Sequence, residues 1–147
     1  MELKRVVVTG LGAVTPVGNT PEETWKNLLE GKSGAAPITH FDTTLFKTKF
    51  ACEVKDLNLN DYIDRKEARK MDRYCQLAMV SAAQGIKDAG LDLEKEDLNR
   101  IGVVYGVGIG GIKTFQDEVV YYGQHEDQGP KFNPFFIPKM IADIASG

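Results

Sequence analysis

Short apolar runs and longer amphipathic segments alternate along the chain, and each kind predicts its own element. Residues 4–9 (KRVVVT) and 100–105 (RIGVVY) are continuous runs rich in valine and isoleucine, and each is followed by glycine. Such runs are typical of strands that are buried on both faces. A shorter strand is predicted at residues 50–54 (FACEV).

Residues that start and end helices bound the first amphipathic segment. Thr20 is a favourable N-cap, Pro21 suits the first helical position, and Glu23 completes a capping box. The apolar spacing that follows predicts a helix that ends at Gly31. A second, longer helix is predicted over residues 71–89, with glycine directly after it.

Two further helices follow the second apolar run. Residues 112–122 have helical spacing, residues 123–133 form a polar loop, and a last helix begins at Pro138 and is still running at Gly147. Because no capping residue precedes Gly147, we expect this helix to be interrupted there. The order strand, helix, helix, strand, helix predicts an α/β fold built in layers.

Composition, charge and cysteine count argue against several classes of partner and site without pointing to a function. A chain of 147 residues, 42% hydrophobic and 27% charged, is expected to form one globular domain, or at most two small ones. No apolar run approaches the roughly 20 residues of a membrane helix, so no membrane partner is expected. A net charge of −3 gives no reason to expect a nucleic-acid partner. Cys52 and Cys75 lack the spacing of a disulfide framework or zinc site, which favours the reducing cytoplasm.

The stretch VVYGVGIGG contains the pattern G-x-G-x-x-G at Gly106, Gly108 and Gly111. In a dinucleotide-binding domain, an acidic residue about 20 positions further on would end a second strand. Glu126 and Asp127 lie near that distance, but their surroundings are typical of a turn. We therefore expect these glycines to permit close backbone approach and positive φ in a strand-to-helix turn. A dinucleotide-binding domain stays the weaker alternative.

Several stretches taken together resemble one protein family. KRVVVTGLGAVTPVGNT, SGAAPITHFD, RKEARKMDRY, GVGIGG and NPFFIP recur in this order in condensing enzymes. The chain resembles the elongating β-ketoacyl-acyl-carrier-protein synthases, closest to the type II synthase of dissociated bacterial fatty acid synthesis. This resemblance implies the thiolase-like fold, with αβαβα layers. It implies that residues 1–147 are most of the first half of that fold, with no internal boundary.

The chemistry that the resemblance implies is decarboxylative Claisen condensation of an acyl thioester with malonyl-acyl carrier protein, an acyltransferase reaction. The nucleophilic cysteine and two histidines of the family are expected beyond Gly147, so this chain alone is predicted to be inactive. Cys52 and Cys75 are expected to be small packed or semi-exposed residues. His40 and His125 match no catalytic position of the family. No cofactor and no metal site are expected.

Three residues match positions of the family's acyl pocket. Ile109 corresponds to the gate residue, whose rotation admits the acyl chain. Phe135 and Phe136 correspond to an aromatic segment that reaches the dimer interface and helps to close the partner's acyl tunnel. The resemblance therefore implies a homodimer. From the residues alone, all three side chains are equally compatible with an ordinary core.

Four basic residues match positions that receive the acidic acyl carrier protein. Lys66, Arg69 and Lys70 have the spacing i, i+3, i+4, which would place three cations on one face of a helix. Glu67 lies among them and weakens the patch. The family often has a second basic pair before the phenylalanine segment, and this chain keeps only Lys131 of it. A solvated charged face is the alternative interpretation for such a run.

Two functions therefore stand beside the dinucleotide-binding alternative. The first is the N-terminal portion of an elongating 3-oxoacyl-acyl-carrier-protein synthase. The second is a non-catalytic relative of the chain-length-factor type, which dimerises and shapes an acyl pocket but lacks the nucleophile. The residue that occupies the nucleophile position beyond Gly147 would distinguish these two.

Overall fold

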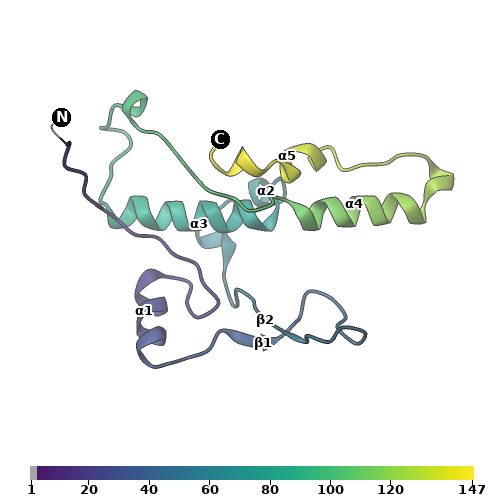
Figure 1. Ribbon diagram of the computed structural model, residues 1–147. Coiled ribbons are helices and arrows are strands. Elements are labelled where there is room, and N and C mark those ends of the chain that lie inside the picture. Colours follow the sequence, from purple (N-terminus) through teal and green to yellow (C-terminus); the bar gives the residue numbers. More distant parts are fainter. Residues whose placement is uncertain (1–2) are drawn as a thin grey trace. The chain divides into compact units, whose positions relative to one another are not determined.

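The computed structural model describes residues 3–147, which form two compact units (Figure 1). Unit 1 comprises the described residues up to Asn58 together with Ser81–Leu91, and unit 2 comprises Leu59–Val80 and Asp92–Gly147. Helix α3 (Arg73–Asp88) contributes its first half to unit 2 and its second half to unit 1. The prediction that residues 1–147 have no internal domain boundary stays a prediction.

Unit 1 contains one helix before α3 and one small sheet. Helix α1 spans Pro21–Leu29, and strands β1 (Ala35–Pro37) and β2 (Phe50–Cys52) form an antiparallel pair. Ala36 lies opposite Ala51 in this pair. The strand predicted at residues 50–54 is therefore confirmed, although it ends earlier than expected.

The start and end of α1 are those that its sequence predicts. The Thr20 hydroxyl accepts a hydrogen bond from the Glu23 N–H at 3.2 Å, and Pro21 occupies the first turn. The Glu23 carboxylate accepts from the Asn19 N–H at 2.7 Å, one residue before the cap. Gly31 follows the helix with φ +68°, a conformation that suits glycine best.

The loop of residues 10–19 packs closely on the second half of α3 through glycines. A Cβ atom on Gly12 would lie 1.8 Å from the Ser81 carbonyl oxygen, and one on Gly10 would lie 2.3 Å from that of Gly85. Both neighbouring atoms belong to the helix backbone, which cannot move aside cheaply. The loop therefore needs glycine at these positions in order to approach the helix.

Polar side chains of α3 hold the same loop. Gln84, which is buried, accepts from the Ala13 N–H at 3.0 Å and donates to the Asn19 carbonyl at 2.7 Å. The Asp88 carboxylate accepts from the Leu11 N–H at 2.8 Å. These bonds satisfy loop backbone groups that have no partner in a sheet or helix.

Unit 2 is mostly helical. In Figure 1, α5 lies alongside α4, and the two helices contact each other. The elements of this unit besides α3 are η1 (Leu59–Asp61), α2 (Arg65–Ala68), η2 (Leu98–Arg100), α4 (Ile112–Gln124), η3 (Glu126–Gln128), α5 (Phe136–Met140) and η4 (Ala142–Ala145). The buried apolar side chains of the described residues all belong to this unit, and they are Ile63, Cys75, Ala78 and Val80.

Two helix predictions meet different outcomes. The long helix predicted at residues 71–89 is confirmed as α3, and Gly90 follows it with φ +62°. The prediction of one continuous helix from Pro138 to Gly147 is wrong. Helix α5 ends at Met140, Ile141 is extended with ψ 123°, and a separate 3-10 turn follows. The extended Ile141 interrupts the helical hydrogen bonds, which apolar spacing does not reveal.

The two buried strands predicted at residues 4–9 and 100–105 are not formed by the described residues. Both segments lack strand pairing there, and their valines are exposed: Val6 is 89% exposed and Val104 is 97% exposed. A strand requires a neighbouring backbone for its N–H and C=O groups. No described strand pairs with these runs, and the Tyr105 N–H bonds to the Ser146 hydroxyl instead, so their β propensity alone does not produce a sheet.

No helix among the described residues is long and apolar enough to cross a bilayer.

Replacing Gly12 with alanine tests the packing of the loop on α3. Since the new methyl group would overlap the Ser81 carbonyl oxygen, we expect the free energy of unfolding to fall by about 1–3 kcal/mol or more in urea titrations. Gly123→Ala is the matched control, because nothing lies within 4 Å of a Cβ atom there. That helical substitution should raise stability by about 0.5–1 kcal/mol. A Gly12→Ala variant as stable as the wild type would contradict the close approach.

Candidate functional site

Every residue predicted to bind substrate or carrier protein belongs to unit 2. The glycine loop of residues 106–111 leads into α4, the phenylalanine pair lies at the start of α5, and three of the basic residues lie in or just after α2. The site can therefore be described within this one unit, from the glycine loop outward.

The last two glycines of the loop approach the chain around α5. The Gly111 N–H donates to the Met140 carbonyl at 3.2 Å, and a Cβ atom on Gly111 would lie 2.1 Å from the Lys139 carbonyl oxygen. Gly110 has φ +89°. The predicted close approach is thus confirmed at Gly111, whereas the positive φ falls on Gly110, which lies outside the G-x-G-x-x-G positions.

The first part of the loop is open. A Cβ atom on Gly106 or Gly108 would meet no described atom within 4 Å, and the side chain of Ile109 is 71% exposed. The described residues thus leave Ile109 unpacked, and its predicted role as pocket gate stays a prediction. The alternative interpretation of Ile109 as an ordinary core residue also stays a prediction.

A buried carboxylate lies where α3 and α4 begin, and no sequence pattern pointed to it. Asp72 accepts from the Tyr74 N–H at 3.3 Å, within the first turn of α3. Its other oxygen accepts from the Thr114 N–H at 3.3 Å and from the Thr114 hydroxyl at 2.5 Å. Since this anion already faces the first turn of α4, the helix terminus that a dinucleotide phosphate would use is occupied by a carboxylate.

The phenylalanine pair divides between a packed and an exposed position. The ring of Phe136 stacks on Phe115 with centroids 6.3 Å apart and on Phe132 at 5.5 Å, and Phe132 in turn contacts Tyr122 at 5.6 Å. Phe135 is 40% exposed. Phe136 is therefore held by rings of its own unit, while Phe135 leaves much of its ring uncovered.

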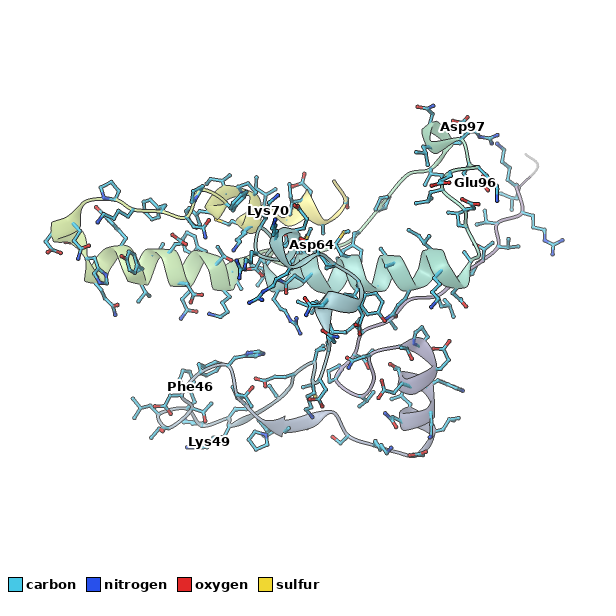
Figure 2. All side chains as sticks on the ribbon, turned by 180° about the vertical axis from the view of Figure 1, so that it is seen from behind. Phe46, Lys49, Asp64, Lys70, Glu96 and Asp97 are labelled. Carbon is cyan, nitrogen blue, oxygen red and sulfur yellow. The ribbon has the colours of Figure 1, made fainter. Side chains whose placement is uncertain are left out.

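The basic segment around α2 does not form the predicted helical face. Asp64 caps α2 by accepting from the Lys66 N–H at 2.7 Å, but the helix ends before Arg69 and Lys70. The Lys70 N–H bonds to the Glu67 carbonyl three residues back, which is a turn rather than a further helical residue. Figure 2 shows Asp64 and Lys70 beside this short helix. The prediction of three cations on one helix face is wrong for this reason.

The four predicted cations also differ in their partners. The Lys70 ammonium pairs with the Glu67 carboxylate at 2.6 Å, so part of its charge is neutralised. Among the described residues, Lys66 and Arg69 are exposed and form no such pair. Lys131 lies between α4 and α5, where its ammonium donates to the Gln128 side chain at 3.4 Å.

The two cysteines occupy the environments that the sequence predicts. Cys52 is exposed on β2, and Cys75 is buried in the first turn of α3. Burial raises the pKa of the Cys75 thiol, and the nearby Asp72 carboxylate raises it further. Because the thiolate is the reactive form, a raised pKa disfavours a nucleophilic role for Cys75.

An apolar cavity of about 290 Å³ lies beside this thiol in unit 2. Cys75, Met79, Pro138 and Ile144 are among its lining residues, and Ile109 is not. The cavity is thus separate from the predicted gate. The described residues contain no cluster of three or more histidine, cysteine or acidic side chains that could hold a metal ion.

A family model described as the N-terminal domain of β-ketoacyl synthases matches residues 3–147. The chain belongs to the β-ketoacyl synthase family. A relative in Synechocystis sp. named 3-oxoacyl-[acyl-carrier-protein] synthase 2 is 47% identical over 148 residues, which is 100% of this chain and 35% of that protein. The chain therefore spans about a third of the length of this curated relative. The family predicted from the sequence motifs is confirmed.

Solved structures confirm the thiolase-like ketosynthase fold for this β-ketoacyl synthase chain. The structure of the ishigamide ketosynthase/chain length factor has a TM-score of 0.78 and 28% identity, over 95% of this chain and 34% of that one. A chain in the structure of a type II PKS acyl-carrier protein in complex with its ketosynthase has a TM-score of 0.74 and 23% identity to this chain. The match covers 96% of this chain and 37% of that one. The described residues thus have the backbone arrangement of such enzymes.

The contrast between the two cysteines is testable by alkylation. Near neutral pH we expect iodoacetamide to modify Cys75 about tenfold more slowly than Cys52, or slower still, because burial restricts access and the raised pKa lowers the thiolate fraction. Peptide mass spectrometry of the native protein measures both rates, and the urea-unfolded protein gives the reference in which they converge. Equal native rates would contradict the burial of Cys75.

Proposed function

We propose that this chain is the N-terminal portion of a 3-oxoacyl-acyl-carrier-protein synthase. The full-length protein would be an acyltransferase that catalyses decarboxylative Claisen condensation of an acyl thioester with malonyl-acyl carrier protein in fatty acid elongation. The observation that carries this proposal is the family match over residues 3–147, together with 47% identity to a relative of that name. The nucleophilic cysteine and both histidines would lie beyond Gly147, so residues 1–147 alone would not catalyse condensation.

The exposed apolar runs support a larger fold. Valines in residues 4–9 and 100–105 expose 61–97% of their surface, which is unusual for continuous β-branched runs in water. Both runs would be strands of the layered sheet once further sequence pairs with them. This accounts for the difference between the predicted buried strands and the structure.

The partner would be an acyl carrier protein, as in the name of the 47% identical relative. Carrier proteins of this family are acidic, and cations on the synthase would steer and orient them. Lys66 and Arg69 are exposed and suit this role best. Lys70 would contribute less because Glu67 pairs with it, and Lys131 would form a separate contact.

The substrate pocket and the dimer interface would involve the remaining predicted residues. Ile109 would gate the acyl pocket, in keeping with its exposed position directly after Gly108, where a Cβ atom would meet no described atom within 4 Å. Phe135 would reach the second protomer of a homodimer, and the ring stack behind Phe136 would hold this segment in place. The protein would act in the cytoplasm, without cofactor or metal ion.

A second candidate is the non-catalytic partner of the chain-length-factor type. The observation that favours it is the TM-score of 0.78 to a ketosynthase/chain length factor structure. The two candidates differ in one residue, since only the enzyme needs a cysteine at the nucleophile position. Sequence beyond Gly147 would distinguish them.

A condensation assay of the full-length gene product tests the proposed function. With acyl-acyl carrier protein and malonyl-acyl carrier protein, we expect release of CO₂ and formation of a 3-oxoacyl product two carbons longer than the acyl donor. Mass spectrometry of the carrier protein detects both the substrate and the product. Absence of product, with a purified dimer that retains its fold, would overturn the enzymatic assignment and favour the non-catalytic candidate.

Charge reversal tests the carrier-protein contact. For the double variant Lys66→Glu, Arg69→Glu, we expect the KM for carrier-bound substrates to rise about tenfold or more at low ionic strength, with kcat nearly unchanged. The control is Lys95→Glu, which removes an exposed pair with Asp92 elsewhere in unit 2. Because the pair is exposed, its loss should change the stability of the protein little. An unchanged KM in the double variant, or the same rise in the control, would show that these cations do not bind the carrier protein.

A further inference from the structure

The Asp72 carboxylate serves two helices that lie far apart in the sequence. One oxygen accepts from the Tyr74 N–H in the first turn of α3, and the other accepts from the backbone and hydroxyl of Thr114, 42 residues later. Asp72 is 9% exposed, so water competes little for these bonds. The side chain therefore joins the beginnings of α3 and α4.

Neither helix has an acidic side chain of its own in its first turn that could accept bonds from the free N–H groups there. The first turns of α3, with 16 residues, and α4, with 13 residues, contain no acidic side chain. The N-cap of α4 is Gly111, which has no side chain with which to bond the free N–H groups. One carboxylate thus supplies the negative charge that both helix N-termini favour.

This carboxylate also fixes the point at which the glycine loop ends. Thr114 is the third residue of α4, and Gly111 directly before the helix is held from the other side by the Met140 carbonyl. Ile109 lies two residues before Gly111. A Cβ atom on Gly108, directly before Ile109, would meet no described atom within 4 Å, whereas one on Gly110, directly after it, would lie 2.6 Å from the Met140 carbonyl oxygen. On its C-terminal side Ile109 is therefore joined through Gly110 and Gly111 to the held start of α4, while a Cβ atom on Gly106 or Gly108 before it would meet no described atom within 4 Å.

We propose that Asp72 is a positioning residue for the acyl pocket. By holding the first turn of α4, it sets the place from which Ile109 projects and thereby influences which acyl chains are accepted. The proposal rests on the proposed function for the role of Ile109. The bonds of Asp72 do not depend on that role, so the two parts can be tested separately.

Two substitutions separate the α4 contact from the α3 cap. Asp72→Ser keeps a good N-cap for α3, but its side chain is shorter and uncharged and does not provide the second oxygen that Thr114 uses. Thr114→Val removes only the hydroxyl from the other side of the same contact. Asp97→Asn is the matched control, because Asp97 caps η2 through the Asn99 N–H at 3.1 Å and plays no part in the loop (Figure 2).

Hydrogen exchange of the full-length protein measures the junction itself. In Asp72→Ser, we expect peptides that cover the first turn of α4 to exchange about fivefold faster or more, while the first turn of α3 changes less. Thr114→Val should act in the same direction with a smaller effect. If Asp72→Ser does not fold, Thr114→Val alone decides the matter. Unchanged exchange in the first turn of α4 in Thr114→Val would overturn the positioning role.

Acyl-chain selectivity measures the consequence for the site. We expect the ratio of kcat/KM for long and short acyl donors to change by about threefold or more in Asp72→Ser, in the same direction as in Ile109→Phe. Asp97→Asn should leave the ratio unchanged. Faster exchange with an unchanged ratio would overturn the link to the pocket, because a cap with a purely structural role lowers stability without altering selectivity. Loss of condensation in the wild-type protein would instead refute the proposed function, while the exchange result would still decide the role of Asp72 at α4.

Discussion

The N-terminus of a helix presents N–H groups that its own backbone cannot satisfy, and in unit 2 two helices share one carboxylate for this purpose. Asp72 bonds to the first turns of both α3 and α4, and its burial protects these bonds from water. The glycine loop, the phenylalanine ring stack and the segment that ends in η4 are all attached to α4 or pack on it. The arrangement of the candidate site thus depends on where this carboxylate places α4.

Local chemistry explains the elements that the sequence predicted well. Helix α1 begins at a Thr-Pro-x-Glu start and ends before glycine with positive φ, and both signals lie within the helix and its immediate neighbours. The strands predicted at residues 4–9 and 100–105 depend instead on a distant backbone partner, which the described residues do not supply. The break at Ile141 likewise involves backbone geometry that apolar spacing does not encode.

The candidate site shows the same division. The motifs around Ile109 and Phe136 could be found in the sequence because the family resemblance depends on their residue types. Asp72 could not be found in this way, since its second partner lies 42 residues away and an aspartate before a helix is a common cap. The spacing of Lys66, Arg69 and Lys70 suggested one helical face, but α2 ends too early to present it.

Two apolar runs of this β-ketoacyl synthase chain have no strand partner among the described residues. Residues 4–9 and 100–105 are exposed in the described structure and would be strands in a complete β-ketoacyl synthase fold. Amide hydrogen exchange of the full-length protein tests this claim most directly. We expect the amides of both segments to exchange as slowly as those in the middle of α3. Exchange as fast as in the exposed loop of residues 43–48 would contradict their assignment as strands.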